Sequence, residues 1–168
     1  MSRRTLWLAR CGLLCAVALL AAALEQLIPA LPMLPPGAKP GLANIAVLAA
    51  GYTLGPGAAL GVALVKVLFA LTTRGVTAFL MSLAGSLLST AVMLIMLHIP
   101  LFGTVGIGVG GAVAHNLAQM SVAAVLLTGG VQYYLPWTLL FAVITGSLTG
   151  ILFGLLQPAL TRLMLLHT

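Results

Sequence analysis

The chain has 168 residues, of which 62% are hydrophobic and only 5% are charged, and its mean hydropathy is +1.24. This composition excludes a soluble globular protein, because too little polar surface remains to cover the apolar residues. We therefore predict one integral membrane domain over residues 1–168, with no room for a separate soluble catalytic or nucleic-acid-binding domain.

The formal net charge of +6 comes from seven basic residues and one acidic residue. The basic residues form no run or stripe, so we attribute them to membrane topology and to an anionic ligand rather than to nucleic acid. Four arginines lie toward the chain ends and favour cytoplasmic termini in a bacterial plasma membrane. They are Arg3, Arg4, Arg10 and Arg162.

Apolar runs separated by turn-forming residues predict an all-α, polytopic bundle of about six transmembrane helices. The predicted helices cover residues 6–28, 42–54, 57–73, 76–97, 104–127 and 135–156. The first run also resembles a cleaved signal peptide, but it is long enough to span a bilayer, which favours a retained helix. The second is short for a full crossing, so it is either tilted, sunk toward one side or re-entrant. Residues 29–41 hold five prolines and two glycines, which predict a loop.

Small side chains form a stripe on the first predicted helix, at spacings of four, three and four residues. Such a stripe marks a place where another helix approaches closely, either inside the bundle or from a partner protein. The stripe consists of Cys11, Cys15, Ala18 and Ala22. Without a histidine or carboxylate beside them, the two cysteines form no metal site, and none is predicted elsewhere.

Glycines predict close helix packing in two later segments. The GxGxxG pattern at Gly106, Gly108 and Gly111 lacks the acidic partner of a dinucleotide site, since no acidic residue follows Glu25. A repeated GxxxG pattern is predicted to form a packing face on the last helix; it comprises Gly146, Gly150 and Gly154. The serines at 82, 86 and 89 share one face of their helix, and we expect them to bond to helix carbonyls.

Polar residues inside the apolar runs are the candidate ligand-binding residues. A lysine at the bilayer centre costs roughly 2.5–3.5 kcal/mol on insertion scales, so Lys66 should face a polar interior. It contacts a ligand, snorkels toward the membrane surface, or forms a buried hydrogen bond to Asn116 or Gln119. Depth in the membrane can be estimated from the position of a residue along its predicted helix, at about 1.5 Å of rise per residue. On this estimate the polar groups form a column from mid-membrane to the external face. The candidates are Lys66, His115, Asn116, Gln119, Asn44, Lys39, Arg74 and Glu25.

Several stretches together resemble the Gx transporter family, also named heptaprenyl diphosphate synthase component I. They are PGAKPGLANIAVL (36–48), the Lys66 helix before Gly75, SLAGSLLS (82–89) and GIGVGGAVAHNLAQ (106–119). The family resembles the S components of energy-coupling-factor transporters. The resemblance implies six helices, an externally open pocket with the first loop as lid, and coupling to membrane or ATPase subunits. It also implies that the stripe of small residues on the first helix docks a partner.

We therefore expect a substrate-binding subunit that captures a small anionic or amphipathic molecule from outside and is coupled to partner subunits. The alternative is a non-catalytic accessory subunit of heptaprenyl diphosphate synthase, or an anchor for a membrane redox complex. The chain contains no aspartate, whereas prenyl elongation needs aspartate-rich motifs that hold magnesium. It also has no Walker A motif. We therefore predict no enzymatic activity and no cofactor, and the lipid bilayer as its environment.

Overall fold

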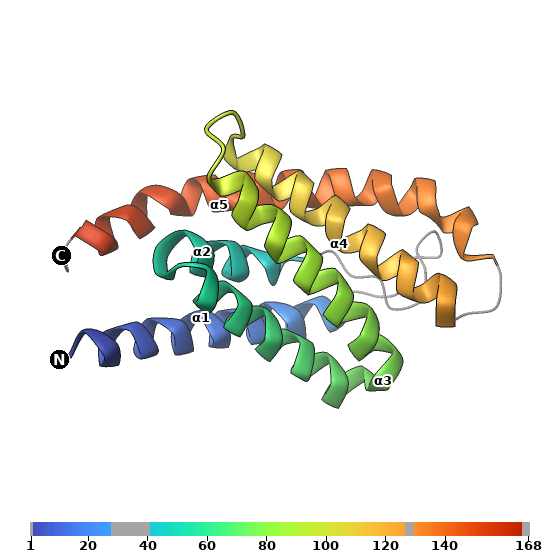
Figure 1. Cartoon of the computed structure of the whole chain (residues 1–168), viewed down its shortest axis with the longest axis horizontal. Helices are drawn as coiled ribbons and strands as arrows, with labels where there is room; N and C mark the ends of the chain where they lie inside the picture. Colours follow the sequence, from blue (N-terminus) through green and yellow to red (C-terminus); the bar gives the residue numbers. More distant parts are fainter. Residues whose placement is uncertain (1, 28–40, 127–129, 166–168) are drawn as a thin grey trace.

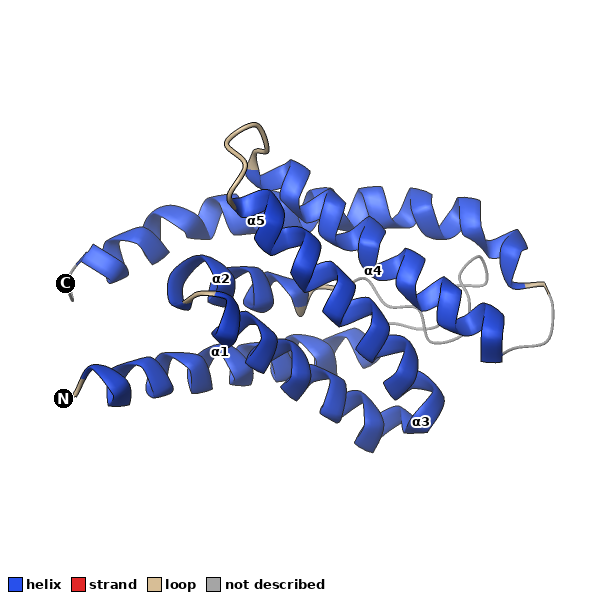
Figure 2. Cartoon of the chain, in the orientation of Figure 1, coloured by secondary structure: helices blue, strands red, loops and turns tan. Residues whose placement is uncertain are grey.

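The computed structural model describes residues 2–27, 41–126 and 130–165, and these form an all-α bundle (Figures 1 and 2). The elements in chain order are α1 (Arg3–Gln26), α2 (Asn44–Leu54), α3 (Pro56–Leu97), α4 (Thr104–Leu126), the short 3-10 turn η1 (Val131–Tyr134) and α5 (Leu135–Leu165). The start of α1 and the end of α5 lie at the same end of the bundle (Figure 1). The predicted loop falls almost entirely on residues 28–40, outside the described residues.

The described residues form five α-helices, so the prediction of six is wrong. Residues 57–73 and 76–97, predicted as separate helices, are both part of α3, which bends at Gly75. Gly75 has φ 81° and ψ −174°, a conformation that is open essentially to glycine alone. One residue thus turns the chain sharply without a loop, and Figure 1 shows α3 as two arms that meet at a bend. We call residues 56–74 the first arm and residues 76–97 the second arm.

Four helices of the described chain are long and apolar enough to cross a membrane: α1, α3, α4 and α5. Many of their large apolar side chains are exposed, as expected of a surface that faces lipid. The chain is therefore a multi-pass membrane protein. The predicted end of the last helix, at residue 156, is too early. The helix continues past Pro158 to Leu165, as proline-containing membrane helices can where neighbouring groups satisfy the freed carbonyl.

The short helix α2 lies at the centre of the apolar core. It has only 11 residues, about 16 Å of helix, which agrees with the prediction that it is too short for a full crossing. Its residues 46–50 are all buried and pack against α1, α3 and α5. At its end, Leu54 O accepts a hydrogen bond from Trp7 Nε1 (3.4 Å), and the Tyr52 hydroxyl bonds to Thr161 Oγ1 (3.1 Å). Residues from α1 and α5 thus hold α2 in place.

Helices α4 and α5 pack backbone against backbone at the predicted glycines. A Cβ atom on Gly146 would lie 2.6 Å from Val109 Cα, and one on Gly150 would lie 2.5 Å from Val105 Cα. Gly108 meets the backbone of both glycines from the opposite side. The predicted GxxxG packing face is therefore confirmed, because any side chain at these positions would force the two helices apart.

The stripe of small residues on α1 faces the interior of the chain. Ala18 is completely buried, and Cys11 and Cys15 pack against the central apolar core. Ala22 lines the cavity described below. Close packing inside the bundle is thus observed for Ala18, and the predicted docking of a partner on this stripe stays a prediction. The exposed side of α1 instead carries large apolar residues, among them Leu8, Leu13, Val17, Leu20 and Leu24.

Candidate functional site

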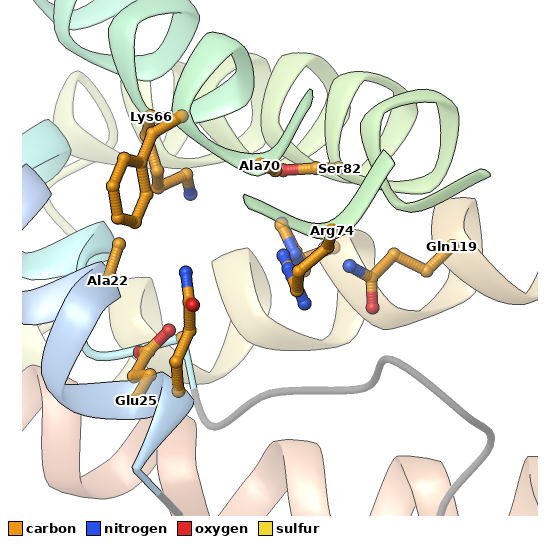
Figure 3. Close-up of a pocket in the computed structure, with 11 residues that line it drawn as sticks. Ala22, Glu25, Lys66, Ala70, Arg74, Ser82 and Gln119 are labelled. Carbon is orange, nitrogen blue, oxygen red and sulfur yellow. The ribbon is translucent and has the colours of Figure 1, made fainter. Parts of the chain in front are cut away.

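A polar cavity lies between α1, the bend of α3 and α4, and most of the predicted site residues meet there. Its volume is about 30 Å³, which is room for one or two water molecules. Figure 3 shows Lys66, Arg74 and Gln119 directed toward one space, with Glu25 on the α1 side. The described residues that line the cavity are Ala22, Glu25, Gln26, Gly41, Lys66, Phe69, Ala70, Arg74, Ser82, His115 and Gln119.

Lys66, on the first arm of α3, is held by α2 rather than by α4. Its side chain is buried, with 8% of its surface exposed, and Nζ donates a hydrogen bond to Asn44 Oδ1 at 2.5 Å. The predicted hydrogen bond from Lys66 to Asn116 or Gln119 is therefore wrong. The first turn of α2 packs across the first arm of α3, so it supplies the oxygen that a buried ammonium group needs. Asn44 thus acts at this site through Lys66.

Glu25 joins the end of α1 to the beginning of α2. The backbone N–H of Ala43, the residue before α2, donates a hydrogen bond to Glu25 Oε1 at 3.3 Å. No side chain within α2 caps this end of the helix, so the carboxylate of α1 acts there instead. A negative charge at this position is also stabilised by the positive end of the helix dipole.

The charges around the cavity do not cancel. Lys66 and Arg74 contribute two basic side chains, and Glu25 contributes one carboxylate. All three interact electrostatically. Lys39, the third basic candidate, lies outside the described residues. The described walls of the cavity therefore carry an excess of positive charge, which favours an anion.

His115 and Gln119 form the α4 wall, where the second arm of α3 comes closest. Gly85 makes room for them, since a Cβ atom there would lie 2.9 Å from His115 Cε1 and 3.0 Å from Gln119 Cγ. His115 is 8% exposed, and its Nδ1 has no hydrogen-bond partner among the described residues. A buried ring nitrogen without a partner is costly, so this atom is available to a polar molecule in the cavity.

Asn116 and the serines at 86 and 89 do not line the cavity. Asn116 Nδ2 donates to the carbonyl of Ala112 on its own helix at 3.0 Å, and the residue does not line the cavity. Ser86 and Ser89 were expected to bond to helix carbonyls, but neither hydroxyl has a partner among the described residues. That expectation is wrong, because both hydroxyls are enclosed between packed helices without reaching a carbonyl.

Six lining residues were not predicted as ligand contacts: Ala22, Gln26, Gly41, Phe69, Ala70 and Ser82. Gln26 Nε2 donates to Thr73 Oγ1 at 3.1 Å, which ties the end of α1 to the first arm of α3. Ser82 lies near the start of the second arm, so the bend brings it toward the charged residues of the first arm. A glutamine next to the only carboxylate was a signal in the sequence, whereas Phe69 is indistinguishable there from its apolar neighbours.

Within the described residues, no three histidine, cysteine, aspartate or glutamate side chains come together as a metal site would require. The fold and the cavity thus define a multi-pass α-helical membrane protein with a buried, positively charged site. The chain belongs to the heptaprenyl diphosphate synthase component I family, whose model matches residues 14–156. Neither a search of curated proteins nor a search of solved structures gives a match.

Proposed function

We propose that this protein is a membrane-embedded subunit that captures a small anionic or amphipathic molecule in the cavity between α1, α3 and α4. The observation that carries the proposal is that the buried side chains of Lys66 and Glu25 and the partly buried side chain of Arg74 line one space, with more positive than negative charge. Charged side chains inside a membrane are costly, and they mark ligand or ion sites far more often than they stabilise a bundle.

Capture takes place from the external side, and the chain does not supply the energy for transport. The two termini lie at the same end of the bundle (Figure 1), and the arginines near them favour a cytoplasmic location for that end. The cavity then opens toward the outside, because Glu25 lies at the far end of α1 from Arg3. Since the sequence has no Walker A motif, we infer that a partner ATPase or membrane subunit drives any transport.

At about 30 Å³ the cavity is too small for an organic ligand, so binding requires that the walls separate. The bend of α3 and the end of α1 are the elements that would move, since together they supply Glu25, Gln26 and Arg74. The ligand's anionic group would then meet Lys66 and Arg74, and an apolar body would extend along Phe69 and the neighbouring apolar helix surfaces.

Mass spectrometry of molecules that co-purify with the protein tests this proposal directly. Removing the central positive charge with Lys66→Met should lower the occupancy of an anionic ligand about tenfold or more, because a close charge pair is lost. Leu68→Met is the matched control: it is on the same arm, it is 56% exposed, and it introduces the same side chain. It should leave ligand occupancy unchanged.

The proposal fails if the protein purifies without an anionic or amphipathic ligand and no flavin, vitamin, quinone or prenyl phosphate stabilises it against heat. It also fails if Lys66→Met and Leu68→Met retain the same amount of ligand. In either case the buried charges would serve only to join α1, α2 and α3.

Family membership favours a second candidate function, that of a non-catalytic accessory subunit of a prenyl diphosphate synthase. The family name describes a component of such an enzyme, and a component without aspartate needs a partner that holds the magnesium. Because the small stripe faces the interior, the partner would meet the exposed side of α1, for example at Leu13 and Leu20, which are 66% and 62% exposed.

Charged substitutions on that surface distinguish the two functions. Leu13→Arg and Leu20→Arg should release a co-purifying synthase subunit if the accessory function is correct, while Lys66→Met and His115→Ala should leave the complex intact. If the surface variants keep their partner and the cavity variants lose activity, the accessory function is rejected.

A further inference from the structure

The only side-chain carboxylate of the protein, Glu25, occupies the position in the cavity that is best suited to a negative charge. It accepts the Ala43 N–H at the beginning of α2, and it lies within electrostatic reach of Lys66 and Arg74. A helix N-terminus and two basic side chains are the groups that bind phosphate and carboxylate ligands in proteins. In this structure those groups act on the protein's own carboxylate.

From this arrangement we infer that Glu25 is an internal competitor, which holds the anion position until the anionic group of the ligand displaces it from the N-terminus of α2. The inference rests on the proposed function, because it concerns the same cavity. It adds which part of the cavity receives the anionic group and what must leave for the ligand to enter. The ligand class is accordingly a molecule with a phosphate or carboxylate group.

A second feature indicates that the cavity accepts a polar molecule beyond the protein's own groups. His115 is more than nine-tenths buried and lines the same cavity, and its Nδ1 has no partner in the described part of the chain. Glu25 satisfies the α2 end of the site, but the α4 end lacks a hydrogen-bond partner for this nitrogen. A ligand anion that replaces Glu25 could extend to His115 and satisfy both ends.

The size of the cavity and the charge of Glu25 both oppose binding of an anion beside the carboxylate. About 30 Å³ accommodates water but not a phosphate group beside the Glu25 carboxylate. Two anions would also repel each other there, since like charges at close range disfavour each other. Even when the walls separate, the ligand's anionic group takes the position of the Glu25 carboxylate, and the affinity of the native protein is reduced by the free energy of that displacement.

Equilibrium dialysis with radiolabelled inorganic phosphate tests the inference on the purified full chain. Glu25→Gln keeps the size of the side chain but removes the competing charge, so it should bind phosphate about tenfold or more tightly than the native protein, because a tethered competitor acts at an effective concentration of about millimolar or above. Glu25→Asp retains the charge and should show no comparable gain. Leu27→Gln introduces the same amide at an exposed neighbouring position and should bind as the native protein does.

The outcomes separate this inference from the proposed function. If the native protein binds phosphate through Lys66 and Glu25→Gln binds equally or more weakly, Glu25 is no competitor, but the cavity remains an anion site. If neither protein binds phosphate, and no anionic ligand co-purifies, both proposals fail. Tighter binding by Glu25→Gln together with unchanged binding by Glu25→Asp supports the inference.

Infrared difference spectroscopy on the native protein provides a second measurement that needs no substitution. Because Glu25 is the only side-chain carboxylate, its stretching band can be assigned with isotope-labelled glutamate. Addition of phosphate should shift this band as the carboxylate leaves the Ala43 N–H. A band that stays unchanged while phosphate binds would overturn the inference, even if Glu25→Gln does not fold.

Discussion

Lys66 shows how one residue of α3 connects to both α1 and α2. Its ammonium group donates to Asn44 in the first turn of α2, while it also faces Glu25 of α1 across the cavity. A buried lysine needs such oxygen partners, because an unpaired ammonium group inside an apolar bundle is far more costly than a paired one. Substitution of Asn44 would therefore affect the position of Lys66 as well as the stability of α2.

Gly85 is the residue at which the fit between the second arm and α4 can be tested. Gly85→Ala would place a methyl group 2.9 Å from His115 Cε1 and 3.0 Å from its Nδ1, so the ring must shift. We expect a loss of about 1–3 kcal/mol in stability from overpacking, together with weaker ligand binding. Thermal unfolding in detergent and ligand occupancy measure the two effects.

Gly12→Ala is the control for that experiment, since nothing lies within 4 Å of a Cβ atom at Gly12. It should leave both stability and ligand occupancy close to native values. If Gly85→Ala behaves like this control, the contact between Gly85 and His115 does not position the ring.

At the scale of the helix, the first arm of α3 lies between two glycines with the same backbone conformation. Gly55 has φ 92° and ψ −179°, and Gly75 has φ 81° and ψ −174°. Gly55 turns the chain from α2 into α3, and Gly75 turns it again into the second arm. These two turns bring Lys66 and Arg74 of the first arm opposite Ser82 of the second arm, so the cavity depends on both.

Gly75→Ala tests the bend. The observed φ and ψ are essentially closed to alanine, so the substitution should cost about 1–3 kcal/mol of stability. Because relief of the strain would straighten α3, it should also separate Arg74 from Ser82 and lower ligand occupancy. Chemical unfolding in mild detergent gives the stability, and co-purification gives the occupancy.

Gly61→Ala provides the comparison on the same arm. Gly61 lies inside the helix with open space around its Cβ position, so alanine should be neutral or stabilise the helix slightly. Equal stability of the Gly61→Ala and Gly75→Ala proteins would show that the bend is not a constraint on the native fold.

For the whole molecule, the sequence predicts the membrane class and the apolar segments well, but not how they connect. Apolar runs and glycine breaks gave most helix boundaries within a few residues, because these depend on local composition, but the end of the last helix was predicted nine residues too early. The helix count was wrong because the chain turns at the single residue Gly75 without a loop, so that residues 56–97 form one bent element, α3. A Gly-Pro-Gly break and a lone glycine look alike as interruptions of an apolar run.

The candidate site was predicted in part for a similar reason. Depth along each helix places Lys66, His115 and Gln119 at comparable levels, and these three do line one cavity. Depth does not give the direction in which a side chain points around its helix. Asn116 therefore bonds to its own helix, whereas its neighbour His115 lines the cavity. The pairing of Lys66 with Asn44 depends on where α2 packs, which periodicity alone does not reveal.

The orientation of the bundle in the membrane decides from which side the cavity is reached, and two exposed residues at opposite ends can report it. The turn between α3 and α4 lies toward the end that carries both termini, and η1 lies toward the other end (Figure 1). Leu101 in that turn is 85% exposed, and Tyr133 in η1 is 77% exposed. Cytoplasmic termini require Leu101 inside and Tyr133 outside.

Cysteine labelling in intact cells measures this orientation, in a background that carries Cys11→Ala and Cys15→Ala. A membrane-impermeant maleimide added outside should label Tyr133→Cys at once, and Leu101→Cys only after the membrane is permeabilised. The reverse pattern would place Glu25 and the cavity on the cytoplasmic side, which contradicts capture from outside. Such a result would favour a subunit that serves a cytoplasmic enzyme, because a ligand could then pass to the cavity directly from that partner.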